Sequence, residues 1–257
     1  SWNQLGTGDN KSSLVPRRAV LVPPATSISV AQSHACALLA DGRSLCWGDN
    51  LGSRLGGGKD KPVNKPVEVV GGFGAVQISA SAETTCARFA DLTVKCWGMG
   101  YRRPRGGHEA WNAPVRAAIG ATRDIAAGGS IFHGHSCTVI KGRVWCWGAN
   151  RGGQLWNGNH RGSATPVKVE GITNAKSVTS GAGHSCAVLR DGSMKCWGRN
   201  GQGQLGIGSR KWSLFGLATA QPVPRLRDVL SASAGGAHTC ALLKDGRVMC
   251  WGENYEG

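Results

Sequence analysis

The chain has 257 residues, 40 of them glycine, and a formal net charge of +15 at neutral pH. No apolar run is long enough to cross a membrane as a helix, so the composition excludes an ordinary transmembrane segment. The strong positive charge favours acidic partners such as nucleic acid, anionic polysaccharide or a membrane surface.

The first element in chain order is the tail of a repeat whose head is missing. Residues 1–8 have the form of the glycine-rich stretch that follows each later copy of the repeat, and residues 250–257 form the head of a repeat whose tail is missing. The two ends are therefore in phase. This phase is compatible with a ring that closes by pairing both ends in one blade, and equally with an excerpt of a longer array.

Five copies of the tripeptide Cys-Trp-Gly divide the rest of the chain at a nearly constant spacing. They begin at residues 46, 96, 146, 196 and 250. A fixed period in this range indicates a solenoid, a propeller or another array of repeats. It predicts one repeat domain over residues 1–257.

A second cysteine lies nine or ten residues before each Cys-Trp-Gly. In the first copy, residues 40–42 (Ala-Asp-Gly) suit a three-residue hairpin loop, which places Cys36 opposite Cys46. In the third copy the turn and the cysteine separation are both one residue shorter, as a cross-strand bridge requires. The spacing predicts five disulfides: Cys36–Cys46, Cys86–Cys96, Cys137–Cys146, Cys186–Cys196 and Cys240–Cys250.

The same hairpin register sets each repeat tryptophan opposite a small residue, as with Trp47 and Ala35, which predicts a packing role for the ring. Four copies also carry a histidine two residues before the first cysteine. Zinc sites use close Cys-x-x-Cys pairs, which these hairpins lack, so we expect a structural histidine bonded within its own sheet. We expect neither a metal nor a cofactor. The histidines are His34, His135, His184 and His238.

Short apolar runs separated by Gly, Pro and Asn predict four strands in each repeat. In the fourth unit they fall at residues 166–169, 177–180, 184–189 and 194–197, and helical periodicity is absent. Four short strands in about 50 residues is the content of a propeller blade. The predicted fold is all-β, a β-propeller of about five four-stranded blades.

Residues 183–208 contain Asp-Gly, Trp-Gly-x-Asn and Gly-Gln-Leu-Gly in fixed order. The chain, over essentially its whole length, resembles the regulator-of-chromosome-condensation family. The resemblance implies a propeller, usually of seven blades, so the five repeats are also compatible with an excerpt of a seven-bladed one. Family members include a chromatin-bound exchange factor for Ran, modules of ubiquitin ligases, a plant UV-B receptor and a secreted β-lactamase inhibitor, so function does not follow from fold. The cysteine pairs, absent from the nuclear exchange-factor pattern, favour a disulfide-containing, secreted-type variant.

The connections that follow Trp-Gly-x-Asn lie at the end of the strands opposite the hairpin turns. They vary most between repeats and combine basic with aromatic residues, which suits an anionic partner. The alternative is solvated loops whose aromatic rings pack on the blades. The candidate partner-binding residues are Arg54, Lys59, Lys61, Tyr101, Arg102, Arg103, Arg105, Trp111, Arg151, Trp156, Arg161, Arg210, Lys211 and Trp212.

These features predict a non-catalytic module that binds a protein or a polyanion through a basic rim of loops. The chain has no nucleophile elbow, phosphate loop or His-Glu-x-x-His motif, so we do not expect an enzyme. Because disulfides persist in oxidising compartments, the expected location is secreted or at the cell surface. If the cysteines are free thiols, the alternative is a nuclear or cytoplasmic exchange factor, or a module that binds chromatin or nucleic acid.

Overall fold

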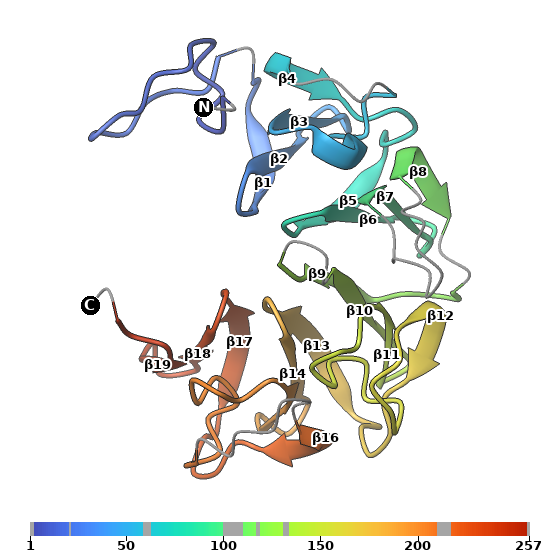
Figure 1. Cartoon of the computed structure of the whole chain (residues 1–257), viewed down its shortest axis with the longest axis vertical. Helices are drawn as coiled ribbons and strands as arrows, with labels where there is room; N and C mark the ends of the chain where they lie inside the picture. The colour runs from blue at the N-terminus through green and yellow to red at the C-terminus, as the bar shows by residue number, and fades with distance from the viewer. Residues whose placement is uncertain are drawn as a thin grey trace. The chain divides into compact units, whose positions relative to one another are not determined.

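A computed structural model describes residues 3–20, 22–58, 63–99, 110–116, 119–130, 134–209 and 217–255 (Figure 1). The chain divides into two compact units, Ser1–Ile119 and Gly120–Gly257. Each unit is described by itself. The expected single domain over residues 1–257 stays a prediction, as does the choice between a closed ring and an excerpt.

The first unit contains two antiparallel sheets in which consecutive strands are neighbours (Figure 1). A short 3-10 helix, η1 (Leu51–Ser53), follows the third strand. The first sheet consists of β1 (Ala25–Val30), β2 (His34–Leu39), β3 (Ser44–Gly48) and β4 (Val63–Glu68). The second consists of β5 (Ala75–Ala80), β6 (Thr84–Phe89), β7 (Val94–Met99) and β8 (Ala110–Arg116).

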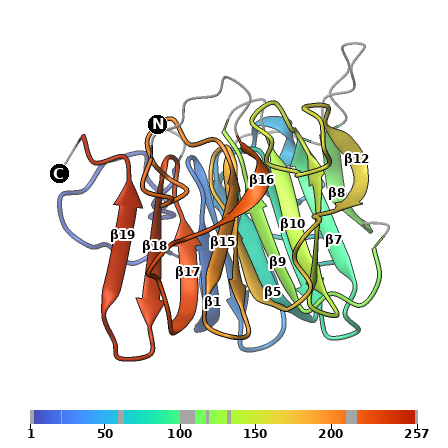
Figure 2. The same cartoon turned by 90° about the horizontal axis from the view of Figure 1, so that it is seen from below.

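The second unit contains three sheets of the same kind, and Figure 2 shows the strands of the last one side by side. One sheet consists of β9 (Asp124–Gly128), β10 (His135–Ile140), β11 (Arg143–Gly148) and β12 (Ser163–Lys168). The next consists of β13 (Ala175–Ser180), β14 (His184–Leu189), β15 (Met194–Gly198) and β16 (Leu217–Pro222). The last has three strands in the described part of the chain: β17 (Val229–Ala234), β18 (His238–Leu243) and β19 (Val248–Gly252).

Five meander sheets of this size are five propeller blades, so the predicted all-β propeller is confirmed. The boundary between blades differs from the sequence expectation. The strand expected at residues 166–169 is β12, and it pairs with β11 of the third blade instead of opening the fourth. As the outer edge strand it tolerates Pro166, because its free side needs no donor.

All five predicted disulfides are present, and no cysteine is free. The hairpin register pairs Cys36 directly with Cys46, and the shorter third turn pairs Cys137 with Cys146. The Cα atoms of each pair are 4.1 Å apart. The turn length therefore sets the cysteine spacing, because only directly opposed residues come this close.

Neighbouring blades of one unit are held together by an apolar seam. In the first unit, Leu38 and the Cys36–Cys46 bridge pack in one buried cluster with Ile78, Phe89 and Trp97 of the second blade. The same positions of the fourth and fifth blades form the corresponding cluster in the second unit. Each seam combines the disulfide of one blade with the tryptophan of the next blade. Both faces of a blade are therefore buried only when blades pack against each other.

The amino-terminal segment occupies the place of a repeat tail. The indole Nε1 of Trp47 donates a 3.1 Å hydrogen bond to the carbonyl oxygen of Gln4. Trp197 donates in the same way to the carbonyl of Gln154, at 2.9 Å. The phase assigned to residues 1–8 from the sequence is therefore confirmed for its described part, residues 3–8.

Candidate partner-binding rim

The asparagine of Trp-Gly-x-Asn organises the first, third and fourth connection loops on the candidate rim. Its Oδ1 accepts a hydrogen bond from the backbone N–H five residues later, at 3.1 Å for Asn50, 2.8 Å for Asn150 and 3.1 Å for Asn200. The Nδ2 of Asn150 also donates to the carbonyl oxygens of Asn159 and Arg161. One buried side chain thus replaces the backbone ladder that a loop lacks, and the connection keeps a defined shape.

Beneath the rim, a histidine of one blade bonds to a hydroxyl of the next. The Nε2 atoms of His34, His135 and His184 lie 2.8 Å from the hydroxyl oxygens of Thr85, Ser185 and Thr239. The structural role expected for the repeat histidines is confirmed for these three, while His238 is exposed and its role stays a prediction. The partners expected for the three within the same sheet are wrong, because the bond crosses to the neighbouring sheet.

The direction of two of these bonds fixes which ring nitrogen of His34 and of His184 carries a proton. The hydroxyl of Thr85 donates to the carbonyl of Arg54, and the hydroxyl of Thr239 to that of Gln204. Each hydroxyl has one proton to give, so it accepts its second hydrogen bond from the imidazole Nε2–H. Nε2 of His34 and of His184 therefore carries a proton, and Nδ1 of all three imidazoles is buried without a partner among the described residues. Because a buried N–H without an acceptor is costly, the neutral form with a bare Nδ1 is favoured.

Burial disfavours the charged form of all three imidazoles. Burial and then the charge of Arg54 lower the pKa of His34 from 6.5 to about 3. Burial and then His184 lower the pKa of His135 to about 3, and burial and then His238 lower the pKa of His184 to about 4. The second blade has Thr84 in place of the histidine, and its hydroxyl donates to the carbonyl of Met99 within the same sheet.

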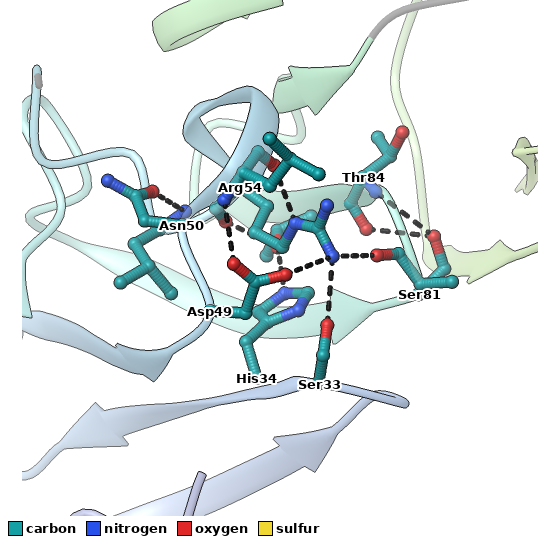
Figure 3. Close-up of polar contacts among 11 residues, drawn as sticks. Ser33, His34, Asp49, Asn50, Arg54, Ser81 and Thr84 are labelled. Carbon is teal, nitrogen blue, oxygen red and sulfur yellow. Dashed lines mark hydrogen bonds and ion pairs between the residues drawn. The ribbon is translucent and has the colours of Figure 1, made fainter. Parts of the chain in front are cut away.

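Arg54 was expected on the exposed basic rim, and this expectation is wrong. The residue is 5% exposed and forms a 3.2 Å ion pair with Asp49 (Figure 3). Its Nε donates to the carbonyl of Leu51, and its Nη1 donates to the hydroxyl of Ser33 and the carbonyl of Ala82. The guanidinium uses its donors within the seam between the first two blades, because a buried cation needs this many acceptors.

Trp156 was also expected on the rim, and it lies in the core instead. It is 9% exposed and belongs to the apolar cluster shared by the third and fourth blades. Its φ of 55° turns the chain where the other repeats have glycine. Since the ring is buried, it cannot stack on a partner.

Arg151 and Arg161 are exposed on the third connection, as expected. The structure adds Arg199, which the sequence did not single out. It occupies the x position of Trp-Gly-x-Asn in the fourth repeat and is exposed beside Gly152 of the third connection. In the part of the chain that the structure describes, none of these three arginines forms an ion pair with a carboxylate. They make up what we call the arginine cluster: Arg151, Arg161 and Arg199.

The other candidate residues stay predictions. The backbone of Trp111 lies in β8 and pairs with Gly98, while its side chain is outside the described part. The remaining candidates lie outside the described residues: Lys59, Lys61, Tyr101, Arg102, Arg103, Arg105, Arg210, Lys211 and Trp212.

The described residues contain neither a group of side chains suited to a metal ion nor a membrane-spanning helix. Among them, no three side chains of His, Cys, Asp or Glu are grouped as a metal site would require. No described helix is long and apolar enough to span a bilayer.

Disulfide-bonded meander blades joined by Trp-Gly-x-Asn connections define a repeat-built β-propeller. Models of the regulator of chromosome condensation (RCC1) repeat match residues 25–51, 175–204 and 229–257, and residues 141–188 and 191–242. These matches span more than half of the sequence, and the chain belongs to the RCC1 repeat family.

Relatives and solved structures agree with this assignment. The ultraviolet-B receptor UVR8 of Arabidopsis thaliana is 29% identical over 306 residues, covering 94% of this chain and 67% of the receptor. The E3 ubiquitin-protein ligase HERC2 of Mus musculus is 27% identical over 226 residues, covering 86% of this chain and 4% of the ligase. The structure of Prp20p from Saccharomyces cerevisiae superimposes with a TM-score of 0.85 at 22% identity, covering 99% of this chain and 65% of that one. The chain thus spans less than two thirds of Prp20p and a small part of HERC2.

Proposed function

We propose that this chain is a non-catalytic binding module that engages an acidic macromolecule through the connection loops of its blades. The observation that carries the proposal is the arginine cluster, in which three exposed cations have no carboxylate partner among the described residues. By contrast, Arg43 and Arg247 at the hairpin turns are paired with Asp41 and Asp245. Unpaired exposed cations attract anions, while paired ones are largely neutralised. Arg143 and Arg190 at the hairpin end are also exposed without an ion pair among the described residues, so they serve as the matched comparison.

We further propose that the module works outside the cytoplasm, secreted or at the cell surface. Five intrachain bridges with no free cysteine support an oxidising compartment, because reducing compartments keep thiols free. The second candidate is a nuclear exchange factor or chromatin-binding module. Prp20p, whose fold this chain shares, has binding properties to Gsp1p and histones, which supports that candidate by fold alone. Thiol counting by mass spectrometry on protein from its native host separates the two.

The test of the rim uses two charge-matched variants of the second unit. The first replaces Arg151, Arg161 and Arg199 with serine. The control replaces Arg143, Arg190 and Arg247, three exposed arginines at the hairpin end. We expect binding of fluorescent heparin, measured by anisotropy, to weaken steeply with salt, because bound cations release counterions.

The rim variant should bind heparin far more weakly and with a smaller salt dependence, while the control should keep most of the affinity. Equal losses in both variants would mean a diffuse positive surface without a binding face. If the unmodified chain binds neither heparin, DNA nor acidic vesicles, the proposed function is wrong.

A further inference from the structure

The residue that follows Trp-Gly is different in each repeat, and in the second and fourth repeats it lies against the connection of the preceding blade. The five residues are Asp49, Met99, Ala149, Arg199 and Glu253. Each has its backbone fixed in the same way, and the N–H of Arg199 donates to the carbonyl of Gly183 at 2.9 Å. Because the backbone is constant and the side chain is not, this position can give each seam its own chemistry.

At the seam between the third and fourth blades, two glycines make room for Arg199. A Cβ built on Gly152 would lie 2.6 Å from Cγ of Arg199, and a Cβ built on Gly183 would lie 2.7 Å from its Cδ. Neither glycine has a positive φ, so the backbone does not require glycine at either place. The requirement comes from the side chain of Arg199, whose aliphatic part lies over both glycines.

This arrangement places the side chain of Arg199 of the fourth blade against Gly152, the residue that follows Arg151 in the third connection. Two hydrogen bonds make the third connection rigid. Gln154 Oε1 accepts the N–H of Gly152 at 2.8 Å, and Asn150 Nδ2 donates to the carbonyl of Arg161. The arginine cluster therefore combines the side chain of Arg199, which packs on two glycines, with the hydrogen-bonded third connection that carries Arg151 and Arg161. Holding cations in place before binding lowers the entropy lost on association.

The third connection and residues 199–209 of the fourth offer cations without exposed aromatic or large apolar side chains of their own, and the exposed ring nearest to them is that of Tyr255, whose hydroxyl bonds to Gln202 Oε1 at 3.0 Å. Single-stranded nucleic acids stack on exposed aromatic rings, and protein interfaces centre on buried aromatic or apolar anchors. In residues 149–162 the one tryptophan, Trp156, is buried, and residues 199–209 contain no aromatic residue. No large apolar side chain is exposed within either segment.

We infer that Arg199, braced by Gly152 and Gly183, forms with Arg151 a preformed site for the sulfate groups of an extracellular sulfated polysaccharide. The inference rests on the proposed function and adds the class of partner. A sulfate presents several oxygens that match the planar fork of a guanidinium, which binds two oxygens at once. Sulfated chains are bound through charge and hydrogen bonds, so an exposed aromatic anchor is not needed.

Charge-neutral variants test the bracing directly. Gly152→Ala and Gly183→Ala each keep the net charge. The Cβ of Gly183→Ala should displace only the flexible side chain of Arg199, while that of Gly152→Ala would also lie 3.1 Å from Oε1 of Gln154, so Gly183→Ala is the cleaner variant. We expect either variant to weaken heparin binding by about three- to ten-fold, and Arg199→Ser or Arg199→Lys by about ten-fold, because a charged two-point contact is lost. The control is Gly236→Ala, whose added Cβ would meet nothing within 4 Å. Thermal melts verify that every variant folds.

Three probes separate this inference from the proposed function: heparin, N-acetylated heparin stripped of its sulfates, and an oligo-dT of similar charge. Tight binding of heparin alone, sensitive to Gly152→Ala, supports the inference. If desulfated heparin or oligo-dT binds as tightly, or if the glycine variants match the unmodified chain, the sulfate site is wrong while the basic rim stands. If the triple arginine variant also leaves heparin binding unchanged, the proposed function fails as well.

Discussion

The Nε2 of His184 and the Oγ1 of Thr239 are 2.8 Å apart and join the fourth blade to the fifth. The two residues are 55 positions apart, one in each of two consecutive repeats. Thr239 also faces Trp251 across its own hairpin. The small residue opposite the tryptophan therefore has two roles, since it leaves room for the indole ring and supplies a hydroxyl to the preceding blade.

Replacing Thr239 with valine should destabilise the chain by about 1–3 kcal/mol, because the buried imidazole N–H of His184 loses its acceptor while shape and strand propensity are kept. Urea unfolding followed by tryptophan fluorescence measures the change. The matched control is Thr165→Val at an exposed position of β12, which should shift the midpoint little. Equal midpoints for both variants would mean that the histidine bond adds no stability.

Stability should fall as the pH drops from about 6.5 towards 4. The folded pKa values of His34 and His135 are about 3 and that of His184 is about 4, below the ordinary value of 6.5. In this interval the unfolded chain binds protons that the folded chain excludes. Each histidine therefore lowers the free energy of unfolding by about 1.4 kcal/mol for each pH unit of acidification. Above the unfolded pKa the contribution of these histidines is complete and constant.

Urea unfolding at pH 4.5 to 7.5 checks this dependence. The solvent-accessible carboxylates with lowered pKa values, Asp9, Asp41, Asp191 and Asp245, titrate below their ordinary value of 3.8 and so act outside this window. His184→Gln should reduce the slope of unfolding free energy against pH by the contribution of one histidine. An unchanged slope would show that burial does not hold this imidazole neutral.

Arg54→Ala should cost about 3 kcal/mol, because it leaves the carboxylate of Asp49 and several backbone acceptors without their cation. The third repeat has alanine and glutamine at the corresponding positions, Ala149 and Gln154. The double variant Asp49→Ala with Arg54→Gln should therefore recover most of the loss. Thermal unfolding of the single and double variants gives the comparison, and a double variant as unstable as the single one would contradict it.

Removing one hairpin bridge should lower stability by about 2 kcal/mol, because each bridge closes a short loop of the unfolded chain. Cys186→Ser with Cys196→Ser tests a bridge whose two sulfurs are completely buried. The Cys240–Cys250 bridge is the more accessible one, since Cys250 is exposed. Under mild reductant, alkylation and peptide mapping should detect its thiols first, and simultaneous reduction of all bridges would show global unfolding instead.

The sequence by itself determined the parts of this protein that are local. Each hairpin, with its turn, its bridge and the small residue opposite the tryptophan, lies within about fifteen residues. Strand alternation and turn length then leave one register, so the pairing of all ten cysteines could be predicted. The nearly constant period of these hairpins, together with four short strands in each repeat, was sufficient to predict a propeller.

Only the tertiary structure decided what happens between repeats. Arg54 and Arg151 are both arginines in basic connections of the sequence, yet Arg54 is buried by acceptors from the second blade and Arg151 is exposed. Trp156 and Arg199 differ from expectation for the same reason, because a neighbouring blade about fifty residues away determines whether a side chain is covered or braced. Strand periodicity describes two faces of one sheet, and it does not encode which side chain of the next blade lies against them.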